Sequence, residues 1–515
     1  MKTPRLLLFA VAACALLGLR AGAEVKLPAI VSDNMVLQQE VPANVWGWAE
    51  PGERVTVKFA GKSASATAGA DGKWKTKLEG LDAGKTGDLT ISGGNTITIH
   101  NVAVGEVWVC SGQSNMEMTV NRTLKPEEEA GAANYPMLRM FTVTKKPAAE
   151  PQSDCVGKWE VCTPETVPLF SAAGYFFARQ LHATLKQPIG MIHTSWGGTP
   201  AEFWTPKPIL ARDADFKGAL TGWEQKVANY PKAKEAYDQA MVKWKEEAQQ
   251  AKDAGKPAPP QPRAPQGGDA FGSPGCLFNG MISPIVNYTI RGAIWYQGEA
   301  NAGNAKGYYK LFPTMIMSWR ALWGAEFPFL FVQLANFNAR HIPPTGQPED
   351  SQWAELRESQ LNTLELPHTG MAVAIDIGEG EDIHPKNKQE VGRRLALAAE
   401  ATVYFQEHEF SGPIFSGAQL EDGKMRLNFR NADGMKAGDD GKLKGFAIAG
   451  EDRKFVWADT EIDGDHIVVS SAQVPHPVAV RYGWADNPTV NLVNATGLPA
   501  SPFRTDDWPQ VMTAK

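Results

Sequence analysis

Five apolar runs that alternate with helix-type segments constrain the fold of this chain more than any other feature. They cover residues 104–110, 190–194, 290–296, 329–334 and 371–375. Short, continuous apolar runs are typical of strands that are buried on both faces, as in parallel sheets. Their alternation with helical patterns over residues 101–407 therefore predicts an α/β domain with three layers, in which helices cover both faces of a parallel sheet.

The regions on either side of this domain have a different pattern. Residues 24–100 and 408–515 contain short alternating runs, such as 55–59 and 467–470, separated by Gly and Pro turns. This pattern is typical of β-sandwiches. At 515 residues the chain is long enough for two or three domains. We expect a β-sandwich-like region before the α/β domain and a β-rich region after it. Packing of the second β region against the first is one arrangement open to them.

One segment, near residues 218–266, is predicted to be an insertion in the α/β domain. Its first part is rich in Lys, Glu, Gln and Ala and predicts a long amphipathic helix, whereas the prolines of 256–265 predict an extended connector. Aromatic residues recur along the helix at seven-residue steps, and we expect them to pack against the domain rather than to bind a ligand: Trp223, Tyr230, Tyr237 and Trp244.

The amino terminus has the pattern of a secretory signal peptide. Lys2 and Arg5 precede an apolar run over 6–19, and an Ala-Gly-Ala site ends at Ala23. Residues 1–23 are therefore predicted to be removed from an exported protein, periplasmic or secreted. Lipid attachment at Cys14 is disfavoured because the apolar run continues past it. No later apolar stretch is long enough to span a bilayer.

The remaining cysteines are Cys110, Cys155, Cys162 and Cys276. An even number in an exported chain permits disulfides, and Cys155 with Cys162 is the predicted pair. The net charge is −6, with both signs interspersed. Because no basic stripe or basic helix is present, nucleic acid is excluded as a partner.

A serine follows the first apolar run of the α/β domain at a sharp turn, Gly112 to Met116. Side chains at the carboxyl ends of strands face the crevice in which open α/β sheets bind ligands. Ser114 is therefore a candidate nucleophile. The alternative is that Ser114 caps a helix that begins near Met116.

Polar residues follow two other apolar runs. Asp382 and His384 come after the run at 371–375, at a spacing that lets a carboxylate orient an imidazole. Gln297, Glu299 and Asn301 follow the run at 290–296 and offer hydrogen-bonding groups. His193 ends another run and is a core histidine or a rival base. The acidic stretch around Asp382 lacks the histidine spacing of a zinc site, so no metal or other cofactor is expected.

Three segments in this order resemble the sialate O-acetylesterase family of SGNH-type hydrolases: Gly-Gln-Ser-Asn-Met, Trp-Tyr-Gln-Gly-Glu and Asp-x-His-Pro. The resemblance also includes 195–199, 277–282 and 497–504, and thus nearly all of the mature chain. It implies an SGNH-like fold and a serine esterase that removes O-acetyl groups from sugars. In that mechanism Ser114 attacks, His384 is the general base and Asp382 orients it.

The resemblance also implies donors for the oxyanion: the N–H of Ser114, a glycine N–H from Gly197 or Gly198, and an amide from Gln297 or Asn301. The usual Gly-x-Asn-Asp block is absent, so the choice between the two amides stays open. Only one residue separates Asp382 from His384, where many SGNH enzymes have two, so a backbone carbonyl is a second candidate for orienting His384. Substrate-binding residues are expected among Gln113, Asn115, Trp196 and Glu299.

Three other classes of protein are alternatives for the same residues. An α/β-hydrolase is disfavoured because its elbow needs glycine where Met116 stands. A glycoside hydrolase would pair Glu299 with Asp382 or Glu106. A non-catalytic carbohydrate-binding protein would stack sugars on Trp196, Trp204, Trp295 or Trp484.

The motifs specify the ester chemistry but do not determine which acetylated sugar is the substrate. O-acetylated sialic acid is the substrate that the resemblance implies, and an acetylated plant polysaccharide such as acetyl-xylan is the alternative. A sialate carboxylate calls for an arginine, and the candidates are Arg122, Arg340, Arg357 and Arg504.

Overall fold

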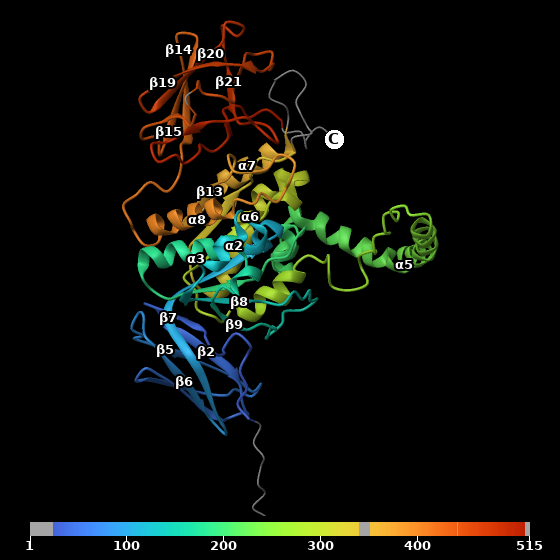
Figure 1. The fold of residues 1–515 in the computed structure, drawn as a ribbon, viewed down its shortest axis with the longest axis vertical. Coiled ribbons are helices and arrows are strands. Elements are labelled where there is room, and N and C mark those ends of the chain that lie inside the picture. The colour runs from blue at the N-terminus through green and yellow to red at the C-terminus, as the bar shows by residue number, and fades with distance from the viewer. Residues whose placement is uncertain (1–23, 339–350, 440, 510–515) are drawn as a thin grey trace, which may run out of the picture.

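The computed structural model describes residues 24–338, 351–439 and 441–509. The predicted signal peptide with Cys14, and the candidate Arg340, lie outside these residues. Three parts follow one another along the long axis of the molecule (Figure 1). An N-terminal β region lies at one end, the α/β part in the middle and a C-terminal β region at the other end.

The central sheet confirms the predicted α/β class. Its strands follow the order β13 (Thr369–Val373), β12 (Phe329–Gln333), β11 (Gly292–Tyr296), β7 (Thr96–Gly112), β10 (Ile189–His193), β8 (Tyr135–Thr142) and β9 (Trp159–Cys162). Neighbouring strands are parallel except β8 and β9, which are antiparallel. All five predicted apolar runs are strands of this sheet.

Helices cover the two faces of the sheet in pairs. On one face α3 (Ala172–Leu185) packs on α8 (Lys388–Thr402), and on the other α6 (Ala305–Trp323) packs on α7 (Gln352–Asn362). Neighbouring strands show why: Trp108 of β7 meets Phe177 of α3 with ring centroids 5.1 Å apart. Trp295 of β11 is in register with Ser111, which lies three residues after Trp108 on β7 and therefore faces the other side of the sheet. There Trp295 stacks on Phe312 of α6.

The N-terminal β region is built on the same long strand as the central sheet. It contains β1 (Val36–Gln38), β2 (Ala43–Trp48), β3 (Arg54–Phe59), β4 (Lys62–Thr67), β5 (Lys73–Leu78) and β6 (Thr86–Ser92). Strand β7 pairs with β6 up to Ala103, and with β10 from Glu106 onward. The predicted boundary between residues 100 and 101 therefore falls inside one continuous strand, and the domain limits stay a prediction.

The C-terminal β region has a core of its own, which includes Leu427, Ile467 and Val480. One sheet holds β14 (Ile414–Glu421), β15 (Lys424–Arg430), β20 (His466–Ser470) and β19 (Asp459–Asp463). The others hold β18 (Val456–Trp457), β17 (Phe446–Ala449), β21 (Ala479–Tyr482) and β23 (Phe503–Arg504), and the pair β16 (Lys436–Ala437) with β22 (Leu492–Val493).

The two β regions do not pack on each other, contrary to the arrangement considered above. They lie at opposite ends of the α/β part (Figure 1). The C-terminal region is joined to the centre by buried polar contacts instead. Arg357 of α7 donates to the carbonyls of Ala485 and Asp486, and Gln333 of β12 donates to Ser501.

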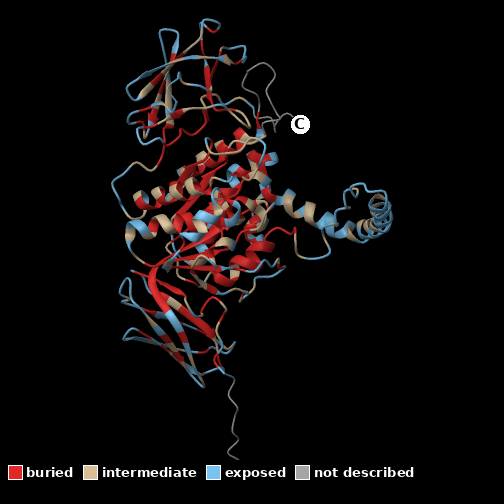
Figure 2. Ribbon diagram, viewed as in Figure 1, coloured by how far each residue is buried: buried red, intermediate tan, exposed pale blue. Residues whose placement is uncertain are grey.

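Helix α5 (Lys217–Asp253), which follows α4 (Lys207–Ala211), projects away from the body of the molecule (Figure 1). None of its residues is buried (Figure 2). Its aromatic residues pack on the returning connector, because Trp244 Nε1 donates to the carbonyl of Pro259 at 2.8 Å. A Cβ on Gly268 would lie 2.2 Å from the Tyr230 ring. Trp244 thus packs within the insertion, whereas Tyr230 and Trp223 lie against Gly268 and Gly272, where the chain returns to the domain.

Within the described residues, Cys110, Cys155, Cys162 and Cys276 are buried free thiols, so the predicted Cys155–Cys162 disulfide is wrong. Strand β9 is extended from Trp159 to Cys162, so this end of the segment does not form the tight turn that would bring Cys162 back toward Cys155 for a disulfide. In the same part of the chain, no helix combines the length and apolarity that a membrane crossing requires.

Candidate active site

Ser114 lies on a tight turn at the carboxyl end of β7. It is the first residue of α1 (Ser114–Glu117), and Gln113 occupies the N-cap position. The hypothesis that Ser114 is the helix cap is therefore wrong. Gly112 has φ of 137°, and a Cβ there would lie 2.2 Å from the carbonyl oxygen of Tyr296. Only glycine fits this turn, and the Gln113 N–H donates to the same carbonyl at 3.0 Å.

A cavity of about 500 Å³ opens beside Ser114. It lies at the carboxyl ends of β7 and β10, where the strand order changes direction and ligands bind in open α/β sheets. Segments that are far apart in the sequence meet here. The lining side chains with polar or charged groups are Ser114, Glu117, Thr119, Arg122, Thr142, Thr144, Lys145, His193, Ser195 and His384.

His384 brings an imidazole into this cavity, with Asp382 behind it. Its Nδ1 lies 3.6 Å from Asp382 Oδ1, and the backbone N–H of His384 donates to the same oxygen at 2.9 Å. This places the carboxylate at ion-pair distance from the ring, beyond a good hydrogen bond. Burial lowers the pKa of His384 below its usual value, and Asp382 opposes that change. The ring is therefore neutral at neutral pH, as a general base must be.

Ser114 and His384 line the same cavity without a direct hydrogen bond between them, although both lie in the described part of the chain. Catalytic hydrogen bonds are often long in unliganded enzymes and tighten when substrate binds.

A second serine and histidine lie in the same cavity. His193 Nε2 is hydrogen-bonded to Ser195 Oγ. Both residues are buried, and His193 Nδ1 has no partner among the described residues. Burial lowers the pKa of His193 to about 4. Without a carboxylate to orient it and with so low a pKa, His193 is the weaker base of the two.

Of the two candidate glycine donors, Gly197 and Gly198, the one that lies next to Ser114 is Gly197. A Cβ on Gly197 would lie 3.2 Å from Ser114 Cβ, and its N–H donates to Glu117 Oε2 at 2.5 Å. Gly198 has φ of 71° and open space around it, and it does not line the cavity. The structure thus brings Gly197 to the nucleophile rather than Gly198.

The two candidate amides are engaged elsewhere. Gln297 Nε2 donates to Asn301 Oδ1 at 2.7 Å and to the carbonyl of Thr199. Asn301 Nδ2 donates to Glu202 at 3.0 Å. Both side chains are buried outside the cavity. The structure therefore does not bring Gln297 or Asn301 together with Ser114.

Of the four expected substrate-binding residues, three lie beneath the cavity. Gln113 Oε1 accepts from the N–H of Ala300 at 3.1 Å, and Asn115 Nδ2 donates to Glu299 Oε1 at 2.5 Å. Gln113 and Asn115 are buried and Glu299 is half-buried, and none of the three lines the cavity. Trp196 is half-buried, and the ammonium of Lys145, a cavity residue, lies 5.4 Å from its ring. Trp196 alone of the four lies at the edge of the site.

Residues that the motifs did not indicate complete the site. Glu117 pairs with Lys145, and both line the cavity. Lys388 lies buried below it. Proximity to Ser114 in the sequence could have indicated Glu117, but no sequence signal singles out Lys145 or Lys388.

Some of the residues that the competing hypotheses need are not available. Glu106 is buried in β7 and pairs with Arg291 at 2.7 Å, six residues or about 20 Å along the strand from Gly112. It cannot act with Glu299 as a glycosidase pair. Trp204, Trp295 and Trp484 are at most 4% exposed, so they cannot stack on sugars. In the described residues no group of three or more potential metal ligands is present.

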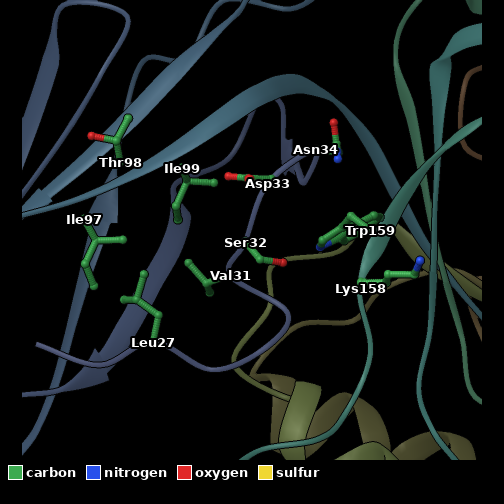
Figure 3. A pocket seen from close by; sticks show the side chains of 10 residues that line it. All are labelled: Leu27, Val31, Ser32, Asp33, Asn34, Ile97, Thr98, Ile99, Lys158 and Trp159. Atoms are coloured by element: carbon green, nitrogen blue, oxygen red, sulfur yellow. The ribbon is translucent and has the colours of Figure 1, made fainter.

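Another cavity, of about 380 Å³, lies in the N-terminal β region (Figure 3). Ile97 and Ile99 of β7, together with Leu27 and Trp159, give it apolar walls. Its Asp33 accepts from the N–H of His100 at 2.7 Å. No histidine lines this cavity, so it lacks the base that the cavity beside Ser114 has.

The fold is an SGNH-like α/β domain, and the proteins that this chain resembles are carbohydrate esterases, a class of carboxylic ester hydrolase. A family model described as carbohydrate esterase, sialic acid-specific acetylesterase, matches residues 271–401. The sialate O-acetylesterase of Rattus norvegicus is 31% identical over 432 residues, which are 76% of either chain. That of Homo sapiens is 30% identical over 445 residues, 79% of this chain and 77% of the human one.

A solved structure agrees with these relatives. The carbohydrate acetylesterase of Xanthomonas citri has a TM-score of 0.79 at 38% identity, and covers 94% of this chain and 100% of its own. The chain belongs to the sialate O-acetylesterase family.

Proposed function

We propose that this protein is an exported serine esterase that removes O-acetyl groups from sugars, with O-acetylated sialic acids as its substrates. The observation that carries the proposal is the single cavity that joins Ser114 at the end of β7 with His384 of the loop after β13. Export rests on the signal-peptide pattern of residues 1–23.

The chemistry follows from the positions of the two side chains. Ser114 Oγ attacks the acetyl carbonyl, and His384 takes the hydroxyl proton and passes it to the departing sugar oxygen. The acetyl-enzyme is then hydrolysed by a water that His384 deprotonates, and acetate leaves. Asp382 stabilises the imidazolium that forms in both steps.

The oxyanion calls for N–H donors beside Ser114. The Ser114 N–H has no acceptor among the described residues, and Gly197 presents its N–H next to it. In the unliganded protein the Gly197 N–H donates to Glu117, so this carboxylate must move or share the donor when the tetrahedral intermediate forms. The oxyanion site is therefore completed only when substrate enters and the Gly197 N–H becomes available.

An arginine in the cavity supports sialic acid as the substrate over a neutral sugar, because sialic acid carries a carboxylate. Arg122 lines the cavity, and its guanidinium has no ion-pair partner in the described residues. Arg357 is buried and donates to backbone carbonyls, and Arg504 pairs with Glu358. Among the candidates within the described residues, Arg122 is thus the one that can receive a sugar carboxylate.

Acetate release tests both parts of the proposal. O-acetylated sialic acid and acetylated xylan would be offered to wild type, Ser114→Ala and Arg122→Ala. We expect turnover of the sialic acid, a loss of about 10³-fold or more in Ser114→Ala, and a loss of about tenfold in kcat/KM for Arg122→Ala.

Each alternative has its own outcome in this experiment. Acetate from xylan alone would retain the serine mechanism and change the substrate to a plant polysaccharide. Wild-type turnover by Ser114→Ala would contradict the mechanism, and no acetate from either substrate would favour a binding protein.

A further inference from the structure

The backbone on both sides of His384 is held by side chains that meet at Asn115, the residue after Ser114. Asn115 Nδ2 donates to the carbonyl of Ile383 at 2.9 Å. Lys388 Nζ donates to the carbonyl of Pro385 at 2.6 Å and to Asn115 Oδ1 at 2.8 Å. The two residues that flank His384 are therefore tied to the turn that carries Ser114.

Lys388 is an unfavourable residue for this position on stability grounds alone. It is fully buried and is the first residue of α8, where the helix dipole opposes a positive charge. Burying a cation has a large desolvation cost, and burial lowers the pKa of Lys388 to about 7. An apolar side chain of similar length would fill the same volume without this cost.

The opposite charge of the cluster comes from Glu299. Its Oε1 accepts from Asn115 Nδ2 at 2.5 Å, and Oε2 has no hydrogen-bond partner within the described residues. The Asn115 amide thus lies between an amine and a carboxyl group, with its oxygen toward Lys388 and its nitrogen toward Glu299. This arrangement fixes the orientation of the amide. A flipped Asn115 would place its NH2 group against the Lys388 amine and its oxygen against the Glu299 carboxyl oxygen. Burial raises the pKa of Glu299, as it lowers that of Lys388.

The other hydrogen bonds of the histidine loop, residues 377–386, leave its middle dependent on this cluster. Gly378 at its start donates to Asn336, and the carbonyl of Lys386 at its end accepts from Leu124. Glu379 joins residues of the loop itself, the N–H groups of Asp382 and Lys386. Between these ends, Asn115 and Lys388 hold the carbonyls next to His384.

We propose that Lys388, Asn115 and Glu299 form a clamp that sets the position of His384 relative to Ser114, and that Lys388 is a positioning residue for the deacetylation. The inference rests on the proposed function, because it takes Ser114 and His384 as the reacting pair. Lys388 touches neither the cavity nor a substrate and acts through Asn115 and the Pro385 carbonyl.

Lys388→Met tests the clamp, because methionine keeps the apolar stem and removes the donor. Steady-state hydrolysis of p-nitrophenyl acetate separates kcat from KM. A misplacement of the base by about 1 Å lowers the rate roughly 10²-fold. We therefore expect kcat to fall by about that factor while KM stays within about threefold of wild type.

Arg320→Met is the matched control for loss of a buried cation. Arg320 is 2% exposed and also donates to two backbone carbonyls, those of Phe327 and His368. These lie at the amino ends of β12 and β13, opposite the cavity. We expect Arg320→Met to lower the melting temperature and to leave kcat of the folded protein within about twofold of wild type.

Glu299→Gln provides a second test that does not depend on Lys388→Met folding. Glutamine keeps the shape and an acceptor for Asn115 and removes the charge, so we expect kcat to fall by about three- to tenfold. In the double variant the Glu299→Gln effect should nearly vanish, because the clamp is already open.

The outcomes separate this inference from the proposed function. An inactive Ser114→Ala together with wild-type kcat in Lys388→Met would overturn the clamp alone. A kcat loss in Lys388→Met that is no larger than the loss in Arg320→Met would also overturn the clamp. If Lys388→Met does not fold, wild-type kcat in Glu299→Gln would overturn it. An active Ser114→Ala would overturn the proposed function.

Discussion

The nucleophile turn, residues 112–117, and the histidine loop, residues 377–386, form the two halves of the site in different ways. The turn is held by backbone: Gly112 packs against the Tyr296 carbonyl, and Asn115 and Met116 are buried. In the histidine loop, the side chains of His384 and Asp382 are 32% and 48% exposed. The sheet thus positions the nucleophile, whereas a few side chains position the base.

Loss of the base in the histidine loop should have the largest effect on activity. We expect His384→Ala to lower kcat about 10³-fold or more, because it removes the stronger of the two imidazole bases in the cavity. His193→Ala removes the other histidine of the cavity and should cost less than about tenfold. Acetate release by the two variants measures both, and the reverse ranking would show that Ser195 and His193 form the reacting pair.

The nucleophile turn should be disrupted by a substitution that displaces its backbone. Alanine at Gly112 would place Cβ 2.2 Å from the Tyr296 oxygen at φ of 137°, so Gly112→Ala should lose at least about 3 kcal/mol of unfolding free energy. Gly198→Ala has a positive φ but open space, and should cost about 1 kcal/mol. Urea unfolding measures both, and equal costs would mean that the turn adapts.

The smallest expected effect concerns the carboxylate of the histidine loop. The Asp382 charge raises the pKa of His384 against the stronger effect of burial, which lowers it, as do Lys388 and Arg122. Asp382→Asn should therefore lower this pKa further and move the acid limb of kcat/KM to lower pH. Since Asp382 also stabilises the imidazolium, kcat should fall about tenfold.

A matched control for this substitution is Asp88→Asn. Asp88 pairs with His100 at 3.0 Å in the N-terminal β region, far from the cavity, and its loss should leave the pH profile unchanged. An acid limb in Asp382→Asn that moves to higher pH would contradict the assignment of His384 as the base.

The sequence predicted best what depends on local pattern. The five buried runs are strands because uninterrupted apolar residues suit both faces of a parallel sheet, whereas β8 was missed because Pro136 and Arg139 interrupt its run. Ser114 and His384 could be proposed because each follows such a strand, and strand ends share one edge of the sheet.

What the sequence could not predict depends on tertiary contacts. Gln297 and Asn301 carry the amides that an oxyanion needs, but their partners Thr199 and Glu202 come from another segment and turn them away from Ser114. Lys388 is one lysine among many in the sequence, and only the fold places it between Pro385 and Asn115. The cysteine spacing suggested a disulfide because the extension of β9 was unknown.

Covalent labelling with a fluorophosphonate, followed by mass spectrometry of the peptides, identifies the reactive serine directly. We predict one label per chain, on Ser114, at a rate that falls about 10²-fold or more in His384→Ala and changes little in His193→Ala. A label on Ser195 that depends on His193 would contradict the account.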